Sequence, residues 1–365
     1  MEKLKRLQKN DKVAIVSLSS GILGESFVKH ELDLGEKRLK EFGLVPVYMK
    51  NALKGLDFIS THPEARAEDL IEAFEDPEIK AIICAIGGID AYKTFPYLVG
   101  NQRLKFAVQN NPKIFLGYSD STNHHLILNN LGLNTFYGQA FITDLAEFEN
   151  DMLPYSKEHF EMLFEPKQTY EIKPSEVWYA DRTSYKPEDV GTNRISHPNQ
   201  GYEVLQGTGK VQGYLYGGCL DVLAYHIGVF CKDHEKPEDL AIKKQYILDY
   251  PVLPNVSNWN DNTLLFIETS DEKMSPEDYR KIVKKLTSFS FFDKIKGILC
   301  GKPIDEVYYN EYKQILIEEL KPYNIPVFFN VNFGHSYPHA IIPYGALAEL
   351  DADNKTIKIL DNIIE

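Results

Sequence analysis

The chain has 365 residues, of which 43% are hydrophobic and 25% are charged, a composition typical of soluble globular proteins. Its length favours two domains over one. The formal net charge is −13, and the basic residues are scattered along the chain. This argues against a nucleic-acid-binding protein, because neutralising phosphates requires clustered Lys and Arg.

The cysteines and the lengths of the apolar runs indicate the cellular compartment of the protein. Two of the four cysteines, Cys84 and Cys300, lie in apolar runs, and no CxxC pair occurs, so we expect buried reduced thiols. The basic N-terminus is not followed by the apolar segment of a signal peptide, and no apolar run reaches the roughly 18 residues of a membrane span. We therefore expect a cytoplasmic protein without a membrane partner.

The first third of the chain alternates between predicted strands and helices. Apolar, β-branched runs predict strands at 12–17, 44–48, 81–86 and 112–118. Amphipathic stretches predict helices at 27–42 and 65–76, and another from about residue 120. This alternation indicates an α/β domain with a parallel sheet covered on both faces.

The periodic pattern breaks over residues 166–207, which are rich in proline, threonine, serine, asparagine and glycine. We interpret this stretch as an inter-domain connection of the kind that can cover a site, since long loops in compact proteins are usually functional or disordered. Apolar runs resume at 264–267, 295–300 and 325–329, and a hairpin is expected to turn at Asp353-Asn354. The prediction is an N-terminal domain over 1–165 and a C-terminal domain over 208–365.

Ser119 is the strongest local signal for chemistry. It follows an apolar strand within Gly117-Tyr118-Ser119-Asp120-Ser121-Thr122, where a helix should begin. A serine on such a turn exposes its hydroxyl, and the N–H of Asp120 at the helix start can bind an oxyanion. Ser119 and its neighbours could equally be an ordinary helix cap. The segment also departs from the usual G-x-S-x-G pattern.

Gly87 and Gly88 directly follow the buried strand at 81–86, at the sheet edge where ligands bind in open parallel sheets. Either glycine could bring a second oxyanion N–H close to a substrate, or both could form an ordinary turn. The sequence does not distinguish the two glycines.

Two further residues could complete a catalytic group. Glu268 ends an apolar strand that would not tolerate an unpaired carboxylate, although the strand end could also face solvent. His335 lies in a polar loop after the strand at 325–329 and could act as a general base, or only hydrogen-bond within the loop. His339 is a competing candidate nearby.

Other chemistries lack support in the sequence. No H-E-x-x-H metal motif, Walker A motif or G-x-G-x-x-G fingerprint occurs, so we expect neither a metal nor another cofactor. We place Trp178 and Trp259 in loops, where a tryptophan could offer a stacking surface or simply pack.

In their order and spacing, several short segments resemble the LD-carboxypeptidase family of serine peptidases (S66), in the branch of the microcin C self-immunity proteins. The resemblance covers nearly the whole chain and rests on the segments 13–16, 85–88, 117–122, 216–220, 265–270 and 332–335. Compared with muropeptide enzymes, the chain is longer over 166–207 and has Ile86 where they usually carry arginine before the two glycines.

The resemblance implies roles for the candidate residues. Ser119 would be the nucleophile, His335 the general base and then acid, and Glu268 the carboxylate that orients it. The N–H groups of Asp120 and of Gly87 or Gly88 would form the oxyanion hole. A loop tryptophan, which we match to Trp178, would stack on a nucleobase.

The resemblance also implies the fold and the substrate. We expect a flavodoxin-like N-terminal domain, a β-rich C-terminal α/β domain, and a site that forms where they meet, usually within a homodimer. The expected reaction is hydrolysis of an amide joining a peptidyl or aminoacyl group to a nucleotide-like moiety. Two alternatives remain, an LD-carboxypeptidase acting on muropeptides and a small-molecule binding protein without activity.

Overall fold

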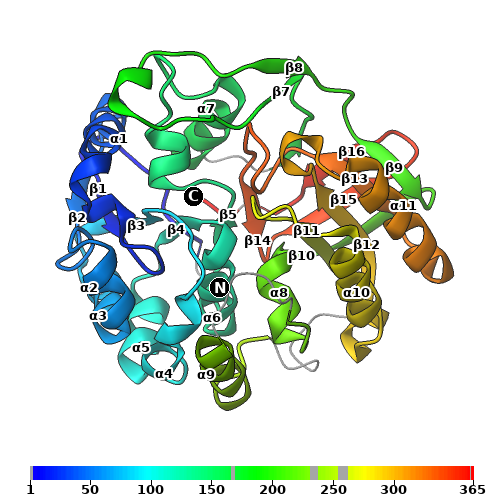
Figure 1. Ribbon diagram of the computed structural model, residues 1–365, viewed down its shortest axis with the longest axis horizontal. Helices are drawn as coiled ribbons and strands as arrows, with labels where there is room; N and C mark the ends of the chain where they lie inside the picture. Colours follow the sequence, from blue (N-terminus) through cyan, green and yellow to red (C-terminus); the bar gives the residue numbers. More distant parts are fainter. Residues whose placement is uncertain (1–2, 166–168, 231–236, 254–261, 362) are drawn as a thin grey trace. The chain divides into compact units, whose positions relative to one another are not determined.

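The computed structural model describes residues 3–165, 169–230, 237–253, 262–361 and 363–365. These residues divide into two compact units (Figure 1). The N-terminal unit consists of residues 3–165, Arg182–Arg194 and Ile363–Glu365, and the C-terminal unit consists of the described residues in 168–181 and 195–362. The stretch predicted as a connection over 166–207 thus contributes residues to both units.

Five parallel strands of the N-terminal unit lie in the order β2-β1-β3-β4-β5. Their bounds are β1 Lys12–Val16, β2 Val45–Tyr48, β3 Ile79–Cys84, β4 Ile114–Gly117 and β5 Thr135–Tyr137. Every residue of β4 is buried, as expected for a strand covered on both faces. The order is that of flavodoxin, so the expected parallel α/β domain is confirmed.

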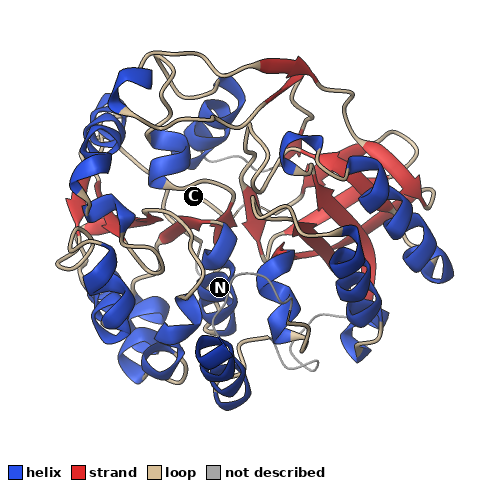
Figure 2. Ribbon diagram, viewed as in Figure 1, coloured by secondary structure: helices blue, strands red, loops and turns tan. Residues whose placement is uncertain are grey.

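Helices cover both faces of this sheet (Figure 2). They are α1 Lys29–Glu41, α2 Leu56–Thr61, α3 Pro63–Glu75, α4 Phe95–Leu98, α5 Gln102–Asn110, α6 Thr122–Asn130 and α7 Pro154–Glu161. Proline at the first position of α3 and α7 suits a helix start, where the missing N–H has no partner to lose. The predicted helices at 27–42 and 65–76 correspond to α1 and α3.

The C-terminal unit is built on an eight-stranded mixed sheet in the order β6-β16-β15-β10-β11-β12-β13-β9. Its parallel centre consists of β10 Lys210–Cys219, β11 Thr263–Glu268, β12 Ile295–Gly301 and β13 Val327–Val331. Antiparallel strands flank this centre, among them the predicted hairpin of β15 Leu347–Asp351 and β16 Thr356–Ile359. A β-rich C-terminal domain is therefore confirmed.

The stretch 166–207 contains more regular structure than the sequence suggests. It carries β6 Tyr170–Ile172, β7 Val177–Tyr179, β8 Ser196–Pro198 and β9 Glu203–Gln206. β6 and β9 form the two edges of the eight-stranded sheet, and β7 pairs with β8 in a separate ribbon. Strands of three or four residues are too short to show an alternating pattern, which is why the sequence did not reveal them.

The remaining elements of the C-terminal unit are α8 Leu220–His226, α9 Pro237–Asp249, α10 Pro276–Thr287, α11 Tyr309–Leu320 and the short strand β14 Ile342–Tyr344. α10 and α11 pack through Tyr279 and Tyr312, whose rings stack with centroids 4.2 Å apart. None of the helices in the described ranges has both the length and the apolar character that crossing a membrane requires.

Candidate active site

Ser119 lies on a sharp turn between β4 and α6. It begins a single 3-10 turn, Ser119–Ser121, directly before the helix. Its φ of 61° is in the left-handed region, which costs a non-glycine residue conformational energy and is often found at functional sites. The backbone N–H of Ser119 donates to the hydroxyl of Tyr137 at 3.1 Å. This is the strand-to-helix geometry that presents a serine nucleophile.

The side chain of Asp120 holds this turn in place through hydrogen bonds to three neighbouring segments. Its Oδ2 accepts hydrogen bonds from the Ser19 hydroxyl at 2.5 Å and from the Ala91 N–H at 2.8 Å, and its Oδ1 accepts from Asn123 Nδ2 at 2.9 Å. Asp120 is buried, so these hydrogen bonds act in a region of low dielectric. The sequence suggested a role for the backbone of Asp120 but gave no sign of this side-chain anchor.

Of the two glycines after β3, Gly87 is the one that passes beside Ser119. A Cβ placed on Gly87 would lie 2.7 Å from Ser119 Cβ, 2.9 Å from its Oγ and 3.4 Å from the Asp120 nitrogen. A Cβ on Gly88 would instead meet the Ser19 Oγ at 2.4 Å. The geometry therefore favours Gly87 as the glycine whose backbone faces the serine hydroxyl.

This close approach makes Gly87→Ala a sensitive test of the turn. The added methyl group would overlap Ser119 Cβ and Oγ, so the hydroxyl must move, and displacing a reacting group by about 1 Å can cost about 10²-fold in rate. We expect kcat to fall by about that factor, and the urea midpoint should also fall, because the new methyl group meets Ser119 Cβ and not the far end of a flexible side chain. Gly100→Ala is the control for destabilisation alone: no atom lies within 4 Å of its Cβ position, but its φ of 75° strains an alanine, so the urea midpoint should fall while kcat stays unchanged. Equal kcat losses in both variants would contradict the assignment.

In the C-terminal unit, Glu268 and His335 form a buried hydrogen-bonded pair. Glu268 Oε2 lies 2.7 Å from His335 Nδ1 and also accepts the His335 backbone N–H at 3.3 Å. Glu268 is 2% exposed and His335 is 8% exposed. A carboxylate on Nδ1 fixes the imidazole so that Nε2 can take up a proton, which is the arrangement of a general base with its orienting acid.

Two glycines make room for Glu268. A Cβ on Gly334 would lie 2.4 Å from Glu268 Cγ, and Gly334 has φ 88°, which a residue with a side chain rarely adopts. A Cβ on Gly301, at the end of β12, would lie 2.6 Å from Glu268 Cβ. The backbone on both sides therefore closes tightly around the carboxylate and holds it against His335.

The pair changes the protonation behaviour of His335. Burial disfavours the imidazolium, but the charge of Glu268 and its hydrogen bond outweigh burial, and Asp271 and Asp221 add to their effect. The pKa of His335 is therefore raised above its ordinary value. The neutral imidazole that a general base requires is reached only on the alkaline side of that value.

The other histidines near the candidate segments have packing roles. His124 and His125 are fully buried on α6, and burial lowers the pKa of His124 to about 3 and that of His125 to about 4, so both remain neutral. His339 is also buried, with its ring stacked on Tyr337 at 4.4 Å.

Trp178 does not lie in a loop, as the sequence suggested, but in β7. It is 8% exposed, and its ring stacks on that of His197 in β8 with centroids 4.3 Å apart. The ammonium group of Lys302 lies 4.9 Å from the Trp178 ring centroid. Trp259 lies outside the described residues.

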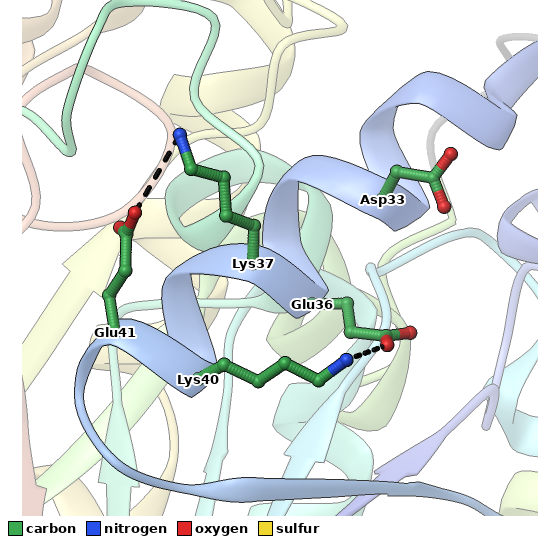
Figure 3. Close-up of a pocket in the computed structure, with 5 residues that line it drawn as sticks. All are labelled: Asp33, Glu36, Lys37, Lys40 and Glu41. Carbon is green, nitrogen blue, oxygen red and sulfur yellow. Dashed lines mark hydrogen bonds and ion pairs between the residues drawn. The ribbon is translucent and has the colours of Figure 1, made fainter.

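A surface hollow on α1 offers no comparable chemistry. It is lined by Asp33, Glu36, Lys37, Lys40 and Glu41 (Figure 3). Lys37 pairs with Glu41 and Lys40 with Glu36, each one helical turn apart. Such exposed pairs contribute only tenths of a kcal/mol, roughly 0.3–0.5 each, and mark a solvated helix face.

Two family models match this chain, one in its N-terminal part and one in its C-terminal part. Residues 13–138 match the model of the LD-carboxypeptidase N-terminal domain, and residues 212–350 match that of the LD-carboxypeptidase C-terminal domain. The first match contains Ser119 and Gly87, and the second contains Glu268 and His335.

Individual relatives are similar along almost the full chain. A crystal structure of an MccF-like protein from Streptococcus pneumoniae in complex with AMP is 45% identical, with a TM-score of 0.89, over 97% of this chain and 99% of that one. The microcin C7 self-immunity protein MccF in complex with aspartyl sulfamoyl adenosine is 25% identical, with a TM-score of 0.81, over the full length of both. A Bacillus subtilis protein named as a probable murein peptide carboxypeptidase is 27% identical over 100% of this chain and 96% of its own.

Proposed function

This chain belongs to the LD-carboxypeptidase family of serine peptidases, in the branch of the microcin C self-immunity proteins, and we propose that it hydrolyses an aminoacyl-nucleotide amide with Ser119, His335 and Glu268. The observation that carries this proposal is the buried Glu268–His335 pair, at 2.7 Å, in a chain whose other unit presents Ser119 on a strained strand-to-helix turn. A carboxylate, an imidazole and a serine hydroxyl are the groups that amide hydrolysis through an acyl-enzyme requires.

In the first half of the proposed reaction, Ser119 Oγ attacks the carbonyl carbon while its proton passes to His335 Nε2. Glu268 stabilises the imidazolium that results. The backbone N–H groups of Asp120 and Gly87 stabilise the negative oxygen of the tetrahedral intermediate, a contribution usually worth about 3–4 kcal/mol per donor. His335 then donates the proton to the leaving nitrogen, the C–N bond breaks, and an ester on Ser119 remains.

In the second half, water replaces the amine. His335 removes a proton from the water molecule as its oxygen attacks the ester carbonyl. The second tetrahedral intermediate collapses with transfer of that proton to Ser119 Oγ. The carboxylic acid product leaves, and the serine and the neutral histidine are restored.

The nucleotide part of the substrate is proposed from two relatives, one in complex with AMP and one with aspartyl sulfamoyl adenosine. We assign Trp178 as the aromatic contact for the nucleobase, because stacking on an aromatic ring accepts any base. In this structure His197 and Lys302 lie close to the Trp178 ring. A bound base would therefore have to displace one of them from the ring.

The test is hydrolysis of two substrates in parallel by the full-length chain. One is an aminoacyl-nucleotide amide and the other a tetrapeptide muropeptide, each with a Ser119→Ala control and with products resolved by chromatography. We expect cleavage of the nucleotide amide with kcat/KM at least tenfold higher. A preference for the muropeptide would contradict the proposed substrate and favour a murein peptide carboxypeptidase, the activity named for the Bacillus subtilis relative.

We further propose that the enzyme acts in the cytoplasm as a homodimer, as the sequence resemblance implies. Light scattering of the purified chain, whose single-chain mass is 41.8 kDa, distinguishes a dimer from a monomer directly. A monomer at working concentration would overturn this part of the proposal without affecting the catalytic assignment.

A further inference from the structure

A buried thiol lies beside the Glu268–His335 pair, and the proposed reaction does not use it. Cys219 is 1% exposed, and one ligand atom each from Cys219, Glu268 and His335 lie within 4.8 Å of one another. The group therefore brings together a sulfur, an oxygen and a nitrogen donor from three separate segments.

The topology of the sheet explains why these residues meet. Cys219 ends β10, Glu268 ends the adjacent parallel strand β11, and the two residues are directly paired in the sheet register. His335 lies in the loop after β13, another strand of the same parallel set. Parallel strands bring their carboxyl ends to one edge, so the thiol is held as firmly as the catalytic pair.

The donor set is typical of zinc. Zn²⁺ binds Cys sulfur at about 2.3 Å, His nitrogen at about 2.0–2.1 Å and carboxylate oxygen at about 2.0–2.2 Å, with tetrahedral geometry. Such ligands stand about 3.5 Å apart, so a span of at most 4.8 Å needs only small side-chain movements. Mg²⁺ and Ca²⁺ prefer oxygen ligands alone, so a thiol and an imidazole select against them.

Asp221 accepts a hydrogen bond from the Cys219 thiol. Its Oδ2 lies 3.6 Å from the Cys219 sulfur, which donates to it, and it also accepts the Ser270 N–H at 3.0 Å. Carboxylates that hold a ligand's orientation in this way are common around metal sites. In such a site Asp221 would orient the Cys219 sulfur, and Cys219, Glu268 and His335 would bind the metal.

We propose that Cys219, Glu268 and His335 form an inhibitory site for Zn²⁺, an inference that rests on the proposed role of His335 as general base. On binding, the Cys219 thiol loses its proton to solvent and a Zn–S bond forms. Coordination through His335 Nε2 occupies the lone pair that would accept the Ser119 proton. Coordination through Nδ1 replaces the hydrogen bond between Nδ1 and Glu268 and leaves the proton on Nε2. Either mode stops general-base catalysis.

The binding test uses full-length protein freed of metal with a chelator and then titrated with Co²⁺, a spectroscopic substitute for Zn²⁺. We expect the near-ultraviolet charge-transfer band of a thiolate–cobalt bond, removed by competing Zn²⁺. Cys219→Ser should lose the band and weaken Zn²⁺ binding at least 100-fold. Cys300→Ala is the matched control, because this buried thiol lies on β12 outside the ligand group and its loss should leave the band intact.

The inhibition test compares turnover with and without Zn²⁺. We expect wild type to be inhibited, while Cys219→Ser and Cys219→Ala retain metal-free turnover and resist inhibition at the same Zn²⁺ concentration. Absence of the cobalt band, equal inhibition of wild type and both variants, or activation by Zn²⁺ would overturn the proposal. Ser119→Ala should bind Co²⁺ like wild type although inactive, so metal binding is measured even if the proposed function fails.

Discussion

Ser119→Ala is expected to lower kcat by roughly 10⁴- to 10⁶-fold, the range for loss of a serine nucleophile that works with a histidine base. Alanine keeps the Cβ, so the backbone conformation at φ 61° meets the same strain in the variant as in wild type. The urea unfolding midpoint should therefore change little. The measurement is steady-state hydrolysis of the aminoacyl-nucleotide amide, with residual substrate binding followed by calorimetry.

Ser121→Ala is the matched control, because Ser121 stands in the same 3-10 turn two residues later. Its hydroxyl interacts with the buried Cys84 thiol, so its loss should affect stability more than turnover. If Ser121→Ala abolished turnover and Ser119→Ala did not, the nucleophile would be assigned to the wrong serine of this segment.

Glu268→Gln should both slow the enzyme and shift its pH profile. The charge of Glu268 and its hydrogen bond raise the pKa of His335 against the opposing effect of burial. Activity requires neutral His335, so in wild type kcat/KM should rise as pH increases through that raised pKa. Without the carboxylate charge burial dominates, the pKa falls, and the acidic limb should move to lower pH by at least about one unit.

The maximal rate of Glu268→Gln should also fall by about 10²- to 10⁴-fold, because glutamine no longer fixes the productive imidazole tautomer. The measurement is a pH–rate profile in the presence of a chelator, so that no metal binds the pair. Asp271→Asn is the control. Asp271 lies 3.8 Å from His335 Nε2, but its side chain is 67% exposed and its charge is screened by water, so its loss should shift the limb much less. Equal shifts in both variants would contradict the assigned role of Glu268.

The sequence predicted these parallel strands well, because β1, β3 and β4 are short runs dominated by apolar residues. Choosing between Gly87 and Gly88 was impossible from sequence, since both follow the same strand. The choice depends on how the β3 and β4 ends lie side by side, with Ile83 opposite Leu116. That register is a tertiary property, and it brings the Gly87 backbone to the Ser119 hydroxyl.

Two other features could not have been read from the sequence. Trp178 looked like a loop residue because β7 has only three residues and pairs with the equally short β8. No sequence motif marked Cys219 as a metal ligand, and it lies 49 positions before Glu268 in the chain. Only the pairing of β10 with β11 makes them neighbours.

The account depends most directly on whether Ser119 is a nucleophile that His335 activates. The decisive measurement is intact-mass and peptide-mapping spectrometry after incubation with a fluorophosphonate, with His335→Ala and Ser119→Ala in parallel. We expect one adduct per chain on Ser119, formed at least about 100-fold more slowly in His335→Ala and absent in Ser119→Ala. An adduct on another residue, or equal labelling of wild type and His335→Ala, would contradict the proposed mechanism.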